Sequence, residues 1–127
     1  MTTRKEKMAK VLVVEDNPVN LKLMRKILES LGHSVSCAET GEDGWAIVSA
    51  EAFDMIFLDM HLPQMDGFEL ARKIRGLPGL TAKIVAVTAM AMAGDCEKII
   101  EAGCDDYISK PIFLNDFREF LARNLKD

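Results

Sequence analysis

Short apolar runs alternate with longer amphipathic stretches five times along the chain. The runs predict strands at about residues 10–15, 34–38, 54–58, 83–88 and 105–109. The first, third and fourth runs are nearly continuous in Val, Ile, Leu and Phe. A strand with one face in water alternates apolar and polar residues instead, so this pattern favours strands that are covered on both faces.

Apolar residues at helical spacing fill the stretches after each run and predict five helices. Asn17 is a good N-cap for the first helix, Pro18 suits its first position, and Gly32 supplies a left-handed stop. Gly103 is expected to end the fourth helix in the same way. The expected helices cover about residues 18–31, 41–51, 67–75, 94–102 and 113–125.

Five strand–helix units in 127 residues predict one domain of the α/β class. We expect a five-stranded parallel sheet with strand order 2-1-3-4-5 and helices on both faces, as in flavodoxin-like folds. Right-handed crossovers then bring the carboxyl ends of all strands to one edge, where ligands bind. Residues 1–8 are expected to form a flexible tail and residues 9–127 the folded domain.

Chemically versatile side chains follow four of the apolar runs. Glu15 and Asp16 follow the first run, Asp59 the third, Thr88 the fourth and Lys110 the fifth. In the predicted sheet these groups meet at one edge. Three neighbouring carboxylates repel each other, which raises the pKa of at least one unless a cation is present. Mg²⁺, or Mn²⁺ in its place, suits such oxygen ligands and leaves room for phosphate oxygens.

A carboxylate beside such an ion is a competent nucleophile toward phosphorus. Each residue also has an ordinary explanation when it is taken alone. A lone Asp59 would more often cap a turn, Lys110 would be a surface lysine, and Thr88 would be a common strand residue. Their conjunction at matching strand ends favours a metal-assisted phosphoryl acceptor.

Composition narrows the functional classes further. The net charge is −4 and the basic residues are scattered, which argues against direct nucleic-acid binding. No stretch approaches the roughly 20 apolar residues that span a bilayer, so membrane insertion is not expected. Cys37, Cys96 and Cys104 lack the spacing of a metal site, and we expect reduced thiols in a cytoplasmic protein.

Four motifs surround these residues. They are Val-Glu-Asp-Asn at 14–17, Asp-Met-His-Leu-Pro-Gln-Met-Asp-Gly at 59–67, Val-Thr-Ala at 87–89 and Tyr-Ile-Ser-Lys-Pro at 107–111. In their order and spacing they resemble the receiver domain of two-component response regulators. The resemblance covers residues 9–125.

The resemblance implies a role for each residue at the sheet edge. Asp59 would be the phosphoacceptor, and Lys110 and Thr88 would contact the phosphoryl group. The metal would be held by Glu15, Asp16, Asp59 and the backbone carbonyl of His61. The peptide bond between Lys110 and Pro111 is expected to be cis.

The resemblance also implies a switch and a set of partners. Thr88 would move toward the phosphate and Tyr107 would rotate inward, remodelling the surface of the fourth helix, fifth strand and fifth helix. Expected partners are a histidine kinase/phosphatase or a histidine phosphotransfer protein, and a protein effector; we expect a monomer that forms at most a weak dimer. Candidate contact residues are Val19, Leu21, Leu23, Met90, Met92, Pro111, Ile112 and Phe113.

Within the family, residues 16–20, 88–92 and 101–107 are similar to the single-domain DivK type, which regulates cell division and polarity. They also resemble receivers of hybrid kinases. A phosphorylation-independent binding module is a further alternative. An Asp-nucleophile phosphatase would need a second acid where His61 stands, and Glu15 and Asp16 would repel a flavin phosphate. We therefore expect a phosphoacceptor that catalyses its own phosphorylation and slow dephosphorylation, not a conventional enzyme.

Four other residues receive ordinary interpretations. His33 is expected in a turn, and His61 is expected to contribute only its carbonyl. Trp45 is expected to be half-buried, and Gly44 beside it to cost the second helix about 1 kcal/mol relative to Ala.

Overall fold

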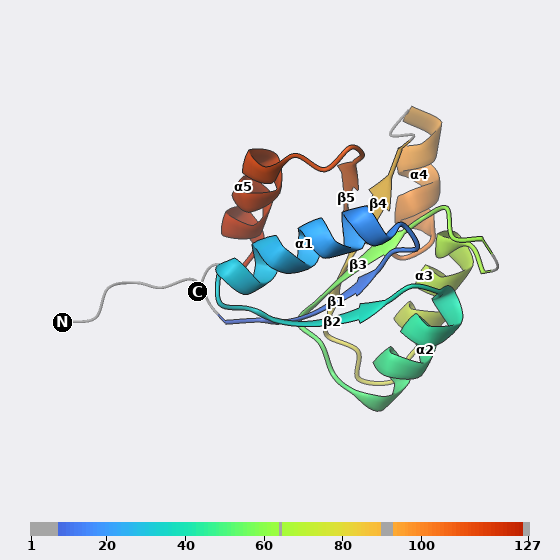
Figure 1. Ribbon diagram of the computed structural model, residues 1–127. Helices are drawn as coiled ribbons and strands as arrows, with labels where there is room; N and C mark the ends of the chain where they lie inside the picture. The colour runs from blue at the N-terminus through green and yellow to red at the C-terminus, as the bar shows by residue number, and fades with distance from the viewer. Residues whose placement is uncertain (1–7, 64, 90–92, 126–127) are drawn as a thin grey trace.

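The computed structural model describes residues 8–63, 65–89 and 93–125. Every expected strand and helix is present, with each boundary within one residue of the sequence prediction (Figure 1). Residues 1–7 of the expected tail lie outside the described residues. The order is β1 (Lys10–Val14), α1 (Pro18–Ser30), β2 (Ser34–Ala38), α2 (Gly41–Ala50), β3 (Met55–Asp59), α3 (Gly67–Arg75), β4 (Lys83–Thr88), α4 (Ala93–Glu101), β5 (Asp106–Ser109) and α5 (Leu114–Asn124).

The five strands form one parallel sheet in the order β2-β1-β3-β4-β5, as predicted. β1 and β3 are neighbours at the point where the strand order reverses. Val14 pairs with Leu58 in that register, so the residues just after β1 lie beside the end of β3. The parallel arrangement therefore brings the predicted reactive residues to one rim of the sheet.

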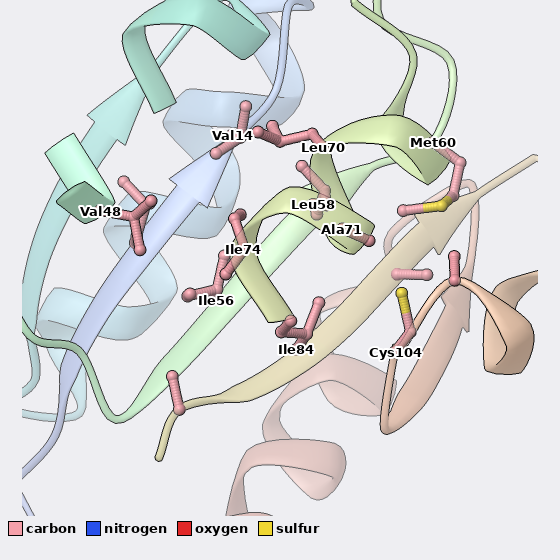
Figure 2. Close-up of a cluster of buried hydrophobic side chains, with 14 of the residues drawn as sticks. Val14, Val48, Ile56, Leu58, Met60, Leu70, Ala71, Ile74, Ile84 and Cys104 are labelled. Carbon is pink, nitrogen blue, oxygen red and sulfur yellow. The ribbon is translucent and has the colours of Figure 1, made fainter. Parts of the chain in front are cut away.

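Helices cover both faces of the sheet, as Figure 1 shows. α1 and α5 cover one face, where Phe57 of β3 packs edge-on against Phe117 of α5 with ring centroids 5.2 Å apart. α2, α3 and α4 cover the other face, and part of that core is drawn in Figure 2. Strands β1, β3 and β4 supply alternate side chains to the two cores, which explains their continuous apolar sequences.

Helix ends follow the local chemistry of the sequence. The Asn17 side chain accepts hydrogen bonds from the backbone N–H groups of Val19 and Asn20, and so caps α1 as predicted. Gly32 and Gly103 have φ values of 90° and 99°, which confirms their predicted left-handed role. No helix among the described residues is long and apolar enough to cross a membrane.

Gly44 lies where α2 packs against β1, and its role is more than a cost to the helix. A Cβ atom at this position would lie 2.8 Å from Cγ2 of Val14. Glycine therefore lets α2 approach β1 closely, and its cost in helix propensity is offset by this packing. The adjacent Trp45 is half-buried, as predicted, and the Nζ atom of Lys73 lies 4.8 Å from its ring centroid.

His33 is more than a turn residue. Its side chain is buried, and its Nδ1 atom accepts a hydrogen bond of 3.0 Å from the backbone N–H of Ala9. Two carboxylates act similarly at the same rim, where strands begin. Asp54 accepts from the N–H of Lys10, and Asp105 accepts from the N–H of Ile84, each at 2.8 Å. Polar side chains on this rim thus satisfy backbone groups.

Candidate phosphoryl-acceptor and metal site

Asp59 is the last residue of β3 and is almost fully buried. Its Oδ1 atom accepts a hydrogen bond of 2.9 Å from the backbone N–H of His61, in the loop that follows. Its Oδ2 atom lies 3.2 Å from Nζ of Lys110, which comes directly after β5. One carboxylate oxygen is thus held by the loop after β3, and the other by a lysine 51 residues further along the chain.

Glu15 directly follows β1 and is as deeply buried as Asp59. Its Oε2 atom accepts a hydrogen bond of 3.1 Å from the N–H of Asn17. The ammonium group of Lys110 lies 3.1 Å from Oε1 as an ion pair and donates to Oε2 at 3.3 Å. Lys110 therefore sits between two buried carboxylates.

The two carboxylates have opposite pKa shifts. Burial and a hydrogen bond to Asp59 raise the pKa of Glu15 to about 7. Burial also acts to raise the pKa of Asp59, but hydrogen bonds from Glu15 and His61 and the charge of Lys110 together lower it. At pH values below about 7 and above the lowered pKa of Asp59, the pair therefore holds one proton, mainly on Glu15, and Asp59 is anionic. A raised pKa at one carboxylate was predicted from sequence, but burial contributes more to it than repulsion between the carboxylates does.

Lys110 responds to the same charges. Burial acts to lower the pKa of its ammonium group, but the charges of Glu15 and Asp59 outweigh that effect and raise it. The lysine is therefore cationic at any physiological pH. Its peptide bond with Pro111 is cis, as predicted.

Asp16 completes an acidic cluster with Glu15 and Asp59. The three residues offer carboxylate oxygens that all lie within 4.8 Å of one another, and the side chain of Asp16 is exposed. A hard divalent ion binds such oxygens, and its positive charge would replace a proton on Glu15. The donor set fits Mg²⁺ or Mn²⁺, with Asp16 open to solvent. The part of His61 as a carbonyl ligand stays a prediction.

Thr88 ends β4 and is buried, and its backbone carbonyl accepts a hydrogen bond of 2.7 Å from the N–H of Lys110. Its Oγ1 atom lies 3.5 Å from Nε2 of His61. The expectation that His61 would offer only its carbonyl was therefore incomplete. No periodicity in the loop after Asp59 could have indicated this contact, because it depends on how the loop folds.

Tyr107 lies on β5 and is 37% exposed. A hydrogen bond between its hydroxyl group and the thiol of Cys96 on α4 raises the pKa of Tyr107. The ring thus points outward, toward α4. Its predicted inward rotation remains a prediction.

The candidate partner contacts divide into four groups. Val19 and Phe113 are 74% and 60% exposed, and Pro111 is also exposed. Leu21 and Leu23 are half-buried against the core beneath α1. Ile112 is only 7% exposed and packs in the core, and its predicted part in partner binding stays a prediction. Met90 and Met92 lie outside the described residues.

Comparison with known proteins places this geometry in a family. The sequence model of the response regulator receiver domain matches residues 11–122. The chain belongs to the response regulator receiver family. Its sequence is 39% identical over 112 residues to the sensor histidine kinase RcsC of Salmonella typhi, a match that covers 88% of this chain. This receiver spans only 12% of the length of that kinase.

Solved receivers have the same fold. The receiver domain of the sensor histidine kinase PA1611 from Pseudomonas aeruginosa is 34% identical, with a TM-score of 0.83 and coverage of 93% of this chain and 98% of that one. Its structure contains a magnesium ion in the active-site cleft. The chemotaxis regulator CheY4 of Vibrio cholerae is 26% identical, with a TM-score of 0.88 and coverage of 94% and 100%.

Proposed function

We propose that this receiver accepts a phosphoryl group on Asp59 from a phosphorylated histidine kinase or histidine phosphotransfer protein. The observation that carries the proposal is the position of Lys110, whose ammonium group lies 3.2 Å from Asp59 and 3.1 Å from Glu15. A cation fixed at this place can neutralise both the acceptor and the charge that arrives with phosphate. The lowered pKa of Asp59 keeps the acceptor anionic.

The transfer forms one bond and breaks one bond. An Asp59 carboxylate oxygen attacks phosphorus, and the phosphorus–nitrogen bond of the donor histidine breaks, with its electron pair returning to the imidazole. Lys110 stabilises the phosphoryl oxygens by charge, and the hydroxyl of Thr88 can donate to one of them. The N–H of His61 keeps Asp59 oriented through Oδ1.

The metal fits the same scheme. Held by Glu15, Asp16 and Asp59, Mg²⁺ would neutralise charge on the phosphoryl oxygens. The magnesium-containing PA1611 receiver supports this assignment. Because the acceptor is consumed in each transfer, the protein is a self-phosphorylating acceptor with slow dephosphorylation rather than a conventional enzyme.

The phosphorylated state would be recognised through α4, β5 and α5. Thr88 is buried at the site and Tyr107 is partly exposed on β5, so movement of the first can free space for the second. A protein effector would bind the changed surface. The exposed side chains of Val19 on α1 and Phe113 before α5 are suited to contact the phosphodonor.

We further propose that the receiver acts in the cytoplasm as a DivK-type regulator, mainly monomeric, with a role in cell division or polarity. The resemblance of residues 16–20, 88–92 and 101–107 supports this assignment. The alternative, a receiver within a hybrid kinase, is favoured by the kinase relatives. An immunoblot of the source cells separates the two, since a hybrid kinase would run far above the size of this chain.

Acetyl phosphate with Mg²⁺ provides the direct test of the acceptor. Intact-mass spectrometry is expected to show one added phosphoryl group, with acetate as the leaving product, and Asp59→Asn is expected to abolish it. Asp54→Asn is the matched control, because it changes an exposed aspartate at the opposite rim. An unchanged mass with acetyl phosphate, and with every phosphorylated kinase tried, would disprove the proposal.

A further inference from the structure

His61 contacts two parts of the site, one through its backbone and the other through its ring. Its backbone N–H donates to Oδ1 of Asp59 at 2.9 Å, while Nε2 of its ring lies 3.5 Å from Oγ1 of Thr88. The His61 side chain is exposed and the Thr88 side chain is buried, so the ring reaches inward from the mouth of the site. One residue thus contacts both the acceptor and the hydroxyl of the predicted switch.

A threonine hydroxyl has one proton to donate. Each χ1 rotamer of threonine places the hydroxyl oxygen in one direction from the backbone. In either tautomer of the ring, contact with Nε2 favours the rotamer that directs Oγ1 toward His61, because the hydroxyl can both donate and accept. A phosphoryl group on Asp59 brings strong acceptor oxygens that compete for the same hydroxyl. Where Nε2 of His61 accepts the one hydroxyl proton of Thr88, donating that proton to the phosphoryl group requires loss of the first contact.

We propose that the His61 side chain is a positioning residue that holds Thr88 in its resting rotamer, so that phosphorylation must exchange the contact between Thr88 and His61 for one between Thr88 and the phosphoryl group. The proposal rests on the proposed function for its consequence, but the resting contact can be measured without phosphate. His61 would then set how readily the switch responds, while Asp59 and Lys110 carry the transfer.

The resting contact is tested by the rotamer of Thr88 in the unphosphorylated protein. Three-bond NMR couplings to the Thr88 methyl carbon are expected to report one dominant χ1 rotamer in the native protein and a larger share of the other rotamers in His61→Ala. His61→Gln, whose amide can also donate and accept, is expected to restore most of the dominant rotamer. Arg72→Ala, which truncates an exposed side chain on α3, is the control and should leave the couplings unchanged. An unchanged rotamer in His61→Ala would overturn the inference.

The exchange is tested with beryllium fluoride and Mg²⁺, which together mimic a phosphoryl group on a carboxylate. His61→Ala is expected to bind the mimic about threefold more tightly, because one weak hydrogen bond no longer has to be broken. In a Thr88→Ala background the same substitution is expected to change nothing. An equal change in both backgrounds would mean that the ring acts on the phosphoryl group directly, and would refute the exchange.

The two proposals fail in different ways. If the native protein binds neither beryllium fluoride nor a phosphoryl group, the proposed function fails, and the couplings still decide whether His61 holds Thr88. If the native protein binds both and the double-mutant comparison shows no coupling, the acceptor function stands and the role of His61 fails.

Discussion

Protonation of Glu15 gives the site a defined dependence on pH. Burial is the largest cause of the raised pKa of Glu15, about 7, and the lowered pKa of Asp59 leaves that residue charged. A divalent ion needs both carboxylates in their anionic form. Metal binding and protonation of Glu15 therefore compete.

From this competition we predict that affinity for Mg²⁺ rises with pH up to about 7 and is nearly constant above it. Below that pH the proton on Glu15 must leave, so affinity should fall by up to about tenfold per pH unit. Calorimetry in buffers of different ionisation enthalpy should detect close to one released proton per ion at pH 6. Glu15→Gln should bind the ion more weakly and lose this dependence. Absence of proton release from the native protein would contradict the assignment.

Individual residues also show where sequence reasoning succeeds. Glu15, Asp59 and Lys110 could be brought together from sequence, because parallel strands place all carboxyl ends on one rim. The contact between His61 and Thr88 could not, since it depends on a loop with no periodic signal. The burial of His33 was missed for a similar reason: a polar residue after a helix stop resembles any other turn residue.

At the scale of elements, the packing of α2 on β1 depends on the absence of a side chain at Gly44. We predict that Gly44→Ala lowers the free energy of unfolding by about 1–3 kcal/mol, because the new methyl would overlap Val14. Urea denaturation measures the effect. The cost should shrink in a Val14→Ala background, where the obstructing methyl groups are absent.

A second glycine supplies the control for that experiment. A Cβ at Gly76, after α3, would meet no atom closer than 3.5 Å, and its φ of −79° suits any residue. Gly76→Ala should therefore leave stability unchanged or raise it by up to about 1 kcal/mol. Equal losses at both positions would show that close approach to Val14 is not the cause.

The loop between β5 and α5 carries two neighbouring apolar residues with different environments. Ile112 is buried and Phe113 is 60% exposed. We predict that Ile112→Ala costs about 2–5 kcal/mol in unfolding free energy. Phe113→Ala should cost less than about 0.5 kcal/mol but slow phosphotransfer from a phosphorylated donor protein.

Urea denaturation and a transfer time course on the same two variants separate these effects. A large stability loss in Phe113→Ala, or unimpaired transfer, would remove that residue from the docking surface. The sequence could not distinguish the two positions, because a run of three apolar residues after a strand shows no preferred face.

For the whole molecule, the order of strands and the two-sided cover of helices were predictable because the three central strands are nearly continuous in apolar residues. The sequence did not show how closely each helix approaches the sheet. That distance depends on pairs such as Gly44 and Val14, which are far apart in the chain and meet only in the folded protein. The hydrophobic pattern of the sequence therefore predicts the architecture, whereas side-chain packing determines the distance between helices and sheet.

The sheet separates two apolar cores, and we predict that substitutions on opposite faces act independently. Ile74→Val and Phe117→Leu belong to different cores, so their stability losses should add within about 0.5 kcal/mol. Phe57→Leu and Phe117→Leu remove one ring contact and should couple by at least about 0.5 kcal/mol. Thermal or urea unfolding of the single and double variants tests both statements. Strong coupling across the sheet would argue for one continuous core.

The rim where the strands begin can accept changes more readily than the rim that carries Asp59. Its polar side chains are occupied with backbone N–H groups, and Gly79, in the loop from α3 to β4, has open space around it. Insertions or attached modules could accumulate in that loop without disturbing the acceptor. Because the two rims are separate, attached segments can vary in evolution while the residues around Asp59 stay the same.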